Sequence, residues 1–106
     1  MTVIKGLDEI RAAQTVKFPS HDDIRLRFPD YTAGWVSAMY HHGLHKWIMC
    51  YHETRDEVID GYKQQKEMCE MFPDVFNWFE YSEMYVFASR GYHNPKWSLM
   101  FMVTED

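Results

Sequence analysis

The 106-residue sequence has little glycine, proline or cysteine. Five Gly and four Pro leave no low-complexity stretch and no linker, so we expect a single domain spanning residues 1–106. Cys50 and Cys69 are too few for the disulfide framework of a small secreted domain. The two cysteines therefore predict reduced, buried thiols of raised pKa in a cytoplasmic protein.

Long apolar runs are also missing. No run approaches the roughly 18 residues that cross a bilayer, so we expect no membrane partner. Asp8 and Glu9 interrupt the N-terminal segment before it could form the apolar core of a signal peptide. Both absences favour a cytoplasmic location.

Positive charge is scarce, because 11 Lys and Arg stand against 16 Asp and Glu, for a net charge of −5. Nucleic-acid binding depends on clustered Lys and Arg, so this balance argues against a nucleic-acid partner. An acidic surface favours a basic protein partner instead.

Catalytic and cofactor motifs are absent as well. The sequence has no Gly-rich phosphate loop, no HExxH zinc motif and no GxSxG nucleophile motif. We therefore expect no cofactor, and the sequence leans away from an enzyme.

Aromatic residues are abundant, with seven Phe, seven Tyr and four Trp, and there are eight Met. This is more bulky side chain than a small core easily hides. Because aromatic residues and Met are enriched where proteins bind, part of this set is expected in a pocket or at an interface.

Strand and helix signals indicate an α+β domain. Aromatic and β-branched runs predict a hairpin, and the capping pair Thr54 and Glu57 begins a helix that Pro73 ends. Residues 21–27 stay open between a helix capped by Ser20 and a strand. The expected core is a mainly antiparallel four-stranded ββαββ sheet with one amphipathic helix packed across it, from strands at 32–40, 45–52, 84–90 and 96–105 and a helix at 54–71.

Both faces of the predicted last strand are apolar. Simple alternation places Trp97, Leu99, Phe101 and Val103 on one face, while Met100 and Met102 lie on the other. A sheet that is wet on one side would alternate apolar with polar residues. The second face therefore needs a cover, which the first 30 residues, a second subunit in a homodimer or a partner protein would supply.

The histidine-rich segment YHHGLHKW, residues 40–47, is the stretch that most resembles a metal site. Adjacent strand residues point to opposite faces, so His41 and His42 do not easily reach one ion. The segment is interpreted as a hairpin tip, with a metal site at His42 and His45 kept as the alternative.

The leading functional hypothesis is a small non-enzymatic protein that binds and inhibits, or recruits, a larger macromolecular partner. Short, acidic, aromatic-rich domains of this kind are typical of immunity proteins and of phage proteins directed against host defences. The expected binding surface combines aromatic anchors with acidic residues, namely Trp78, Glu80, Tyr81 and Glu83. The alternative is a small enzyme or ligand-binding domain that uses His45, His52 and Glu53 for proton transfer or metal binding.

Overall fold

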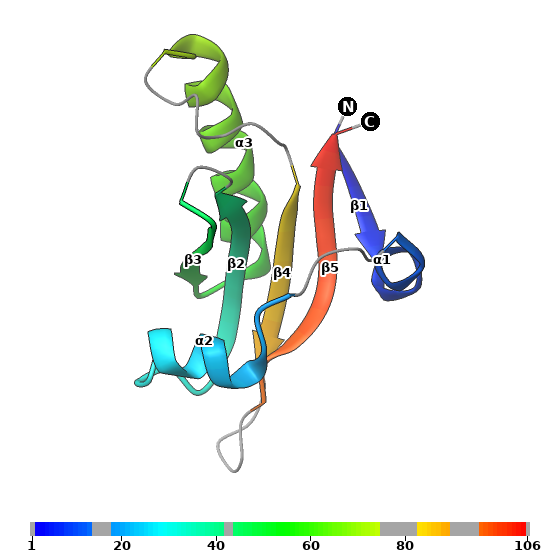
Figure 1. Cartoon of the computed structure of the whole chain (residues 1–106), viewed down its shortest axis with the longest axis vertical. Coiled ribbons are helices and arrows are strands. Elements are labelled where there is room, and N and C mark those ends of the chain that lie inside the picture. The colour runs from blue at the N-terminus through cyan, green and yellow to red at the C-terminus, as the bar shows by residue number, and fades with distance from the viewer. Residues whose placement is uncertain (1, 14–17, 42–43, 75–82, 90–95, 106) are drawn as a thin grey trace.

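The computed structural model describes residues 2–13, 18–41, 44–74, 83–89 and 96–105. These residues form a five-stranded antiparallel sheet, in the strand order β1-β5-β4-β2-β3, and three helices (Figure 1). The elements in chain order are β1 (Thr2–Gly6), α1 (Leu7–Ala13), α2 (His21–Arg27), β2 (Gly34–His41), β3 (Lys46–His52), α3 (Arg55–Met71), β4 (Met84–Ser89) and β5 (Ser98–Glu105).

The α+β class and the antiparallel sheet are confirmed, but the sheet has five strands and not the four expected. The additional strand is β1, which pairs with β5 from Thr2↔Glu105 to Gly6↔Phe101. This pairing joins the two ends of the sequence, so the termini lie side by side (Figure 1). No helix in these described ranges is long and apolar enough to cross a membrane.

The predicted hairpin is present as β2 and β3. Their register is continuous, from Trp35↔His52 at the open end to His41↔Lys46 at the turn. His45, at the end of the turn, has a φ of 52°, the left-handed region that non-glycine residues seldom adopt. The histidine-rich segment therefore forms the tip of a hairpin in its described residues.

The helix α3 begins and ends where its sequence signals place it. Thr54 is the N-cap, and its Oγ1 accepts a hydrogen bond from the Glu57 N–H at 3.2 Å. The expected reciprocal bond differs, because the Glu57 carboxylate accepts from the Glu53 N–H at 3.0 Å rather than from Thr54. Val58 and Tyr62 are fully buried against the sheet, whereas Met71, the last residue of the helix, is 68% exposed. The last turns of α3 extend past the hairpin end of the sheet (Figure 1).

The undecided segment 21–27 is the helix α2. Its capping box is complete, since Ser20 Oγ accepts from the Asp23 N–H at 3.2 Å and Asp23 Oδ2 accepts from the Ser20 N–H at 2.9 Å. These two bonds satisfy backbone donors that a helix start otherwise leaves unpaired. The helix places Ile24, which is fully buried, against the sheet. Burying such a side chain contributes about 1.5–3 kcal/mol.

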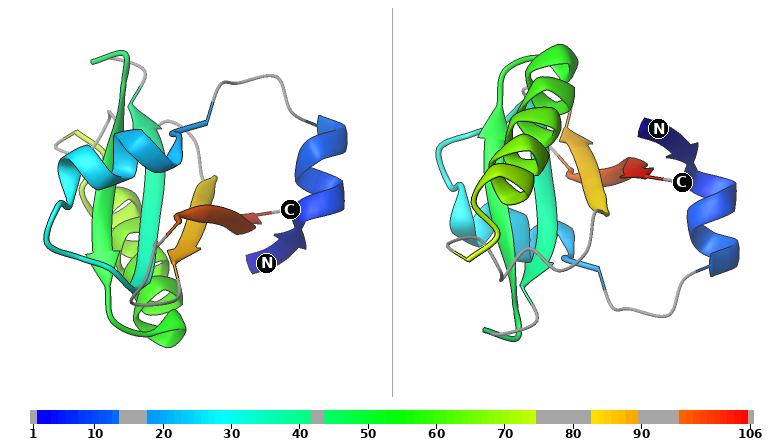
Figure 2. Two further views of the ribbon diagram at one scale, coloured as in Figure 1. Left: turned by 90° about the horizontal axis from the view of Figure 1, so that it is seen from below. Right: turned by 90° about the horizontal axis from the view of Figure 1, so that it is seen from above.

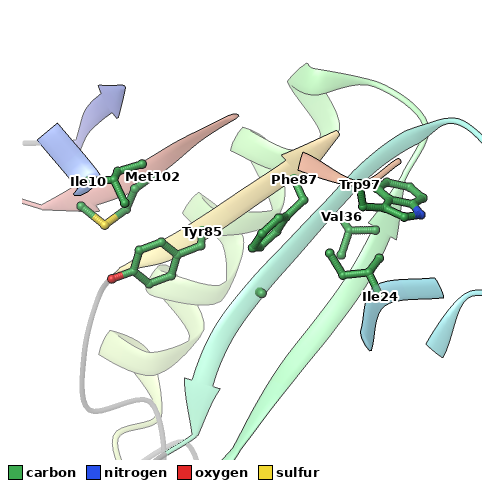
Figure 3. Packing of buried hydrophobic residues seen from close by; sticks show 8 residues of the cluster. Ile10, Ile24, Val36, Tyr85, Phe87, Trp97 and Met102 are labelled. Atoms are coloured by element: carbon green, nitrogen blue, oxygen red, sulfur yellow. The ribbon is translucent and has the colours of Figure 1, made fainter. Parts of the chain in front are cut away.

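Both faces of the sheet are covered from within the chain. Figure 2 shows α2 crossing one face of β2 and β3, with α3 on the opposite face. Ile10 of α1 extends the cover on the α2 side, where it packs at the end of the cluster near Met102 (Figure 3). The sequence left three possible covers for this face, namely the first 30 residues, a second subunit or a partner protein. The structure shows that residues of the N-terminal segment cover it. The α2 side buries Ile10, Ile24, Val36, Ala38, Tyr85, Phe87, Trp97 and Met102, and the α3 side buries Met39, Val58, Tyr62, Met84, Val86, Phe101 and Val103.

A bulge in β5 overturns the simple alternation predicted for the last strand. Phe87 pairs with Leu99 and Val86 pairs with Phe101, so Met100 has no opposite residue on β4. The extra residue reverses the facing of everything after it. Trp97 and Leu99 consequently pack on the α2 side, whereas Phe101 and Val103 pack on the α3 side.

The start of β2 depends on a glycine that lies beneath an aromatic ring. Gly34 has a φ of +132°, and a Cβ added there would lie 2.5 Å from Tyr51 Oη. The Tyr51 hydroxyl donates to the Ala33 carbonyl at 2.7 Å, and the Tyr31 ring stacks on Tyr51 with centroids 3.7 Å apart. Tyr51 therefore holds the loop between α2 and β2 against β3.

We expect Gly34→Ala to lower the free energy of unfolding by about 2–4 kcal/mol, because the new methyl group displaces the Tyr51 ring and the backbone is strained. Urea denaturation followed by circular dichroism measures this loss. Gly6→Ala is the matched control, since nothing lies within 4 Å of a Cβ at Gly6, and it should change stability by no more than about 0.5 kcal/mol. Equal effects of the two substitutions would contradict the role given to Gly34.

Candidate binding site beside the edge strand

Four aromatic rings form a cluster on the α2 side of the sheet, near its β3 edge. Phe18 lies 4.5 Å from Tyr85 and 6.3 Å from Trp47, measured between ring centroids. Trp47 also contacts Tyr85 at 5.6 Å and Tyr40 at 5.4 Å, both edge to face. Phe18 comes from the segment before α2, and the other three come from strands, so the cluster joins the N-terminal residues to the sheet.

A cavity of about 350 Å³ opens beside this cluster. This volume is at the small end of the range of ligand pockets, which suits one side chain better than a cofactor. Among the described lining residues, two aromatic rings, a proline and a methionine form an apolar wall, and Asp23 is the charged residue. The lining residues are Phe18, Pro19, Asp23, Trp47 and Met49.

The lining residues come from two elements that fold for separate reasons. Trp47 and Met49 lie two residues apart in β3 and therefore share its α2 face. Phe18 and Pro19 precede the Ser20 cap, and Asp23 lies in the first turn of α2. The capping box therefore positions the Asp23 carboxylate at the cavity.

Beside the cavity, β3 forms one edge of the sheet. It pairs with β2 on one side, and no other described strand pairs with its outer side. Half of the backbone N–H and C=O groups of such a strand point away from the sheet. The candidate site thus has an apolar cavity and a row of backbone hydrogen-bonding groups next to each other.

Tyr85 and Glu83 form a polar contact at the start of β4. The Tyr85 hydroxyl donates to Glu83 Oε2 at 3.0 Å. Burial raises the pKa of Tyr85 to about 12, and the charge of Glu83 and this hydrogen bond add to the rise. Tyr85 therefore remains a neutral donor at physiological pH.

The residues predicted to bind a partner are only partly described. Trp78, Glu80 and Tyr81 lie outside the described residues. Glu83 is half-buried and accepts the hydrogen bond from Tyr85. The structure thus connects Glu83, through Tyr85, to the aromatic cluster around Trp47.

The histidines of the hairpin tip do not converge in their described part. His41 Nδ1 accepts a hydrogen bond from the Leu44 N–H at 3.1 Å, which closes the turn. His45 is exposed, and His42, its partner in the alternative metal site, lies outside the described residues. Within the described ranges, no group of three or more His, Cys, Asp and Glu could hold a metal ion.

The alternative proton-transfer set is divided between the two ends of β3, with His45 before the strand and His52 and Glu53 at its other end. His45 precedes the strand at the hairpin tip, whereas His52 is its last residue, so roughly 20 Å of extended chain separates them. His52 Nε2 shares a hydrogen bond of 3.2 Å with Ser37 Oγ, while Glu53 is exposed. Ser37 is only 4% exposed, so its hydroxyl is closed to a substrate in this arrangement.

Both cysteines are free thiols of intermediate exposure, so the prediction that they are buried is wrong. Burial raises the pKa of the Cys69 thiol, and the nearby charge of Glu70 adds to this rise. A thiol of raised pKa carries little of the reactive thiolate at neutral pH, as the sequence predicted for this residue.

Comparison of the chain with family models, with curated proteins and with solved structures finds no match.

The pH dependence of stability tests the environment of His52. Burial lowers the pKa of His52 below its ordinary 6.5, and the charge of Glu57 opposes this only in part. The unfolded chain therefore binds a proton more readily than the folded chain does. We expect the free energy of unfolding to fall as the pH drops from 6.5 toward the lowered pKa, and His52→Gln to flatten this dependence. Urea titrations of both proteins between pH 7.5 and 4.5 measure it, and identical slopes would contradict this environment.

Proposed function

We propose that this chain is a small cytoplasmic binding domain without catalytic activity. It captures an extended segment of a larger protein along β3, and thereby blocks or recruits that protein. The observation that carries the proposal is the outer edge of β3, which lies beside an aromatic cavity.

Among the described residues, β3 is neither shortened nor bulged and has no proline and no charge at its centre, which are features that often protect exposed edges. Edge strands are usually shortened, bulged, charged or interrupted by proline, which prevents another chain from pairing with them. β3 has seven residues and no proline, and its register with β2 is unbroken. Its one Lys or Arg is Lys46, at the strand's first position. The opposite edge, β1, has five residues and continues directly into α1.

Strand addition is an established way to bind an extended segment. Main-chain hydrogen bonds supply affinity, and pockets for alternate side chains supply specificity. Both parts are present here, since the edge of β3 offers backbone groups and the cavity lies on its α2 face. The alternative, a small enzyme, is less well supported than strand addition. Two of its proposed proton-transfer residues, His45 and His52, are separated by the length of β3 and so do not form one site.

A short strand-forming peptide tests the proposal directly. We expect acetyl-Thr-Val-Arg-Val-Thr-amide to shift the amide signals of β3 saturably in ¹⁵N-edited NMR titrations. A peptide of the same sequence, N-methylated at alternate residues to block one edge, should bind at least about tenfold more weakly, because it loses the backbone hydrogen bonds. Because the peptide can pair through either of its two edges, two methylated versions are needed, one blocked on each edge. If both bind as tightly as the unmethylated peptide, strand addition is ruled out.

A second copy of the chain is the other occupant that this edge admits. In that case the β3 signals would broaden or shift with protein concentration in the absence of peptide. If the occupant is a segment of a partner protein instead, the β3 signals of the free chain should not change with protein concentration.

The aromatic segment predicted from the sequence provides a further test with the natural partner. Once that partner has been isolated with the unmodified chain, Trp78→Ala should weaken its binding by at least about tenfold, as truncating an aromatic anchor does. Glu80→Lys with Glu83→Lys should weaken binding to a basic partner. Calorimetry measures the affinity, and thermal unfolding checks the fold.

The charge control is Glu67→Lys with Glu70→Lys, because these exposed residues of α3 have the same spacing as Glu80 and Glu83. If the control pair weakens binding as much as the test pair, net charge and not the segment determines affinity.

A further inference from the structure

We infer that the cavity beside β3 binds an aromatic side chain of the segment that pairs with this strand. This selection rests on the proposed function and names the type of residue that the captured segment carries. Three observations carry it: the position of the cavity relative to the strand, its apolar walls and its volume.

Pairing geometry directs one side chain of the added segment toward the cavity. In an antiparallel pair, directly opposite residues point to the same face, with Cβ atoms about 4.5–5.5 Å apart. Trp47 and Met49 both face the α2 side and line the cavity. A residue opposite either of them therefore points toward the same cavity. Its sequence neighbours point to the α3 side, next to Ile48 and Cys50.

The cavity lies beside the half of β3 that is nearer to the hairpin turn, because Trp47 and Met49 belong to that half. Toward the other end of the strand, Tyr31 stacks on Tyr51 and the Tyr51 hydroxyl donates to the Ala33 carbonyl. The loop between α2 and β2 thus packs at that end. A segment of about five residues is long enough to pair with residues 46–50 and to place one side chain in the cavity.

The described walls of the cavity suit an aromatic ring. The Phe18 and Trp47 rings lie 6.3 Å apart between centroids and are tilted by 50°, so they are not stacked on each other. An added ring can therefore lie at the 4.5–7 Å that aromatic pairs prefer from both of them. The Met49 thioether adds a favourable contact to an aromatic ring, and Pro19 adds an apolar surface.

The volume of the cavity fits the same kind of side chain. A buried apolar cavity of about 150 Å³ is large enough to accept benzene, which is the ring of phenylalanine. At about 350 Å³ the cavity beside β3 has room for such a ring together with the carbon that joins it to the backbone. An alanine at the same position of the segment would leave most of this space unfilled.

The charged residue at the cavity, Asp23, is engaged within the chain. Its Oδ2 accepts a hydrogen bond from the Ser20 N–H, as part of the capping box of α2. Selection is therefore assigned to the apolar walls and not to this carboxylate. A charged side chain that entered between these walls would lose hydration, which disfavours it relative to an aromatic ring.

Four peptides that differ only at the central residue test the selection. In the frame acetyl-Thr-Val-X-Val-Thr-Lys-Lys-amide, X is phenylalanine, leucine, alanine or arginine, and the two lysines keep each peptide soluble. We expect phenylalanine to bind about tenfold more tightly than alanine, from the apolar area that it buries. It should bind about threefold more tightly than leucine, from its contacts with the aromatic walls, and also more tightly than arginine. Titrations of the β3 amide signals in ¹⁵N-edited NMR measure the four affinities.

Met49→Ala removes one wall of the cavity and leaves the backbone of β3 able to pair. The preference for phenylalanine over alanine should then fall by about threefold. Ile48→Ala is the matched control, since Ile48 is the neighbouring residue, has similar exposure and faces the α3 side. It should leave the preference unchanged, because the peptides carry the same residues on that face. Thermal unfolding checks that both variants are folded.

The outcomes separate the selection from the proposed function. If the phenylalanine, leucine and alanine peptides bind equally along β3, strand addition stands and an aromatic-selective cavity is wrong. Tighter binding of the arginine peptide than of the phenylalanine peptide, or an equal loss of preference in Met49→Ala and Ile48→Ala, also overturns the selection. If no peptide shifts the β3 signals, the proposed function itself fails.

Discussion

The sheet is apolar on both faces, and each face must be covered for the fold to be stable. On one face, α3 buries Val58 and Tyr62 against β2, β4 and β5. On the other, α1 and α2 bring Ile10 and Ile24 onto the cluster around Tyr85 and Phe87 (Figure 3). The bulge at Met100 supports this division, because it turns Phe101 toward α3 while Trp97 stays on the α2 side.

This two-sided cover explains why the candidate site lies where it does. Figure 2 shows α2 and α3 on opposite faces of β2 and β3, and no described strand pairs with the outer side of β3. The cover on the α2 side also leaves a cavity, because Phe18 and Pro19 meet Trp47 and Met49 without filling the space between them. The edge and the cavity together are the basis of the proposed capture of an extended segment.

Local chemistry predicted part of this structure. The Thr54 cap and Pro73 bounded α3, and the aromatic runs gave the hairpin of β2 and β3. Residues 21–27 were ambiguous because their apolar residues alternate, and only the hydrogen bonds of the capping box settle them as a helix. The strand β1 and the bulge at Met100 depend on pairing between residues distant in sequence, for which no local signal exists. The excess of aromatic residues predicted a pocket or interface, but its location requires Phe18 to meet Trp47 across the fold.

Amide hydrogen exchange along β3 of the free protein tests the central claim, that this strand has an open outer edge. The account predicts alternation over residues 46–50: amides that point toward β2 exchange slowly, and those that point outward exchange at least about a hundredfold faster. Uniformly slow exchange over these residues, unchanged on dilution, would show that the outer edge is already paired within the chain and would contradict the account.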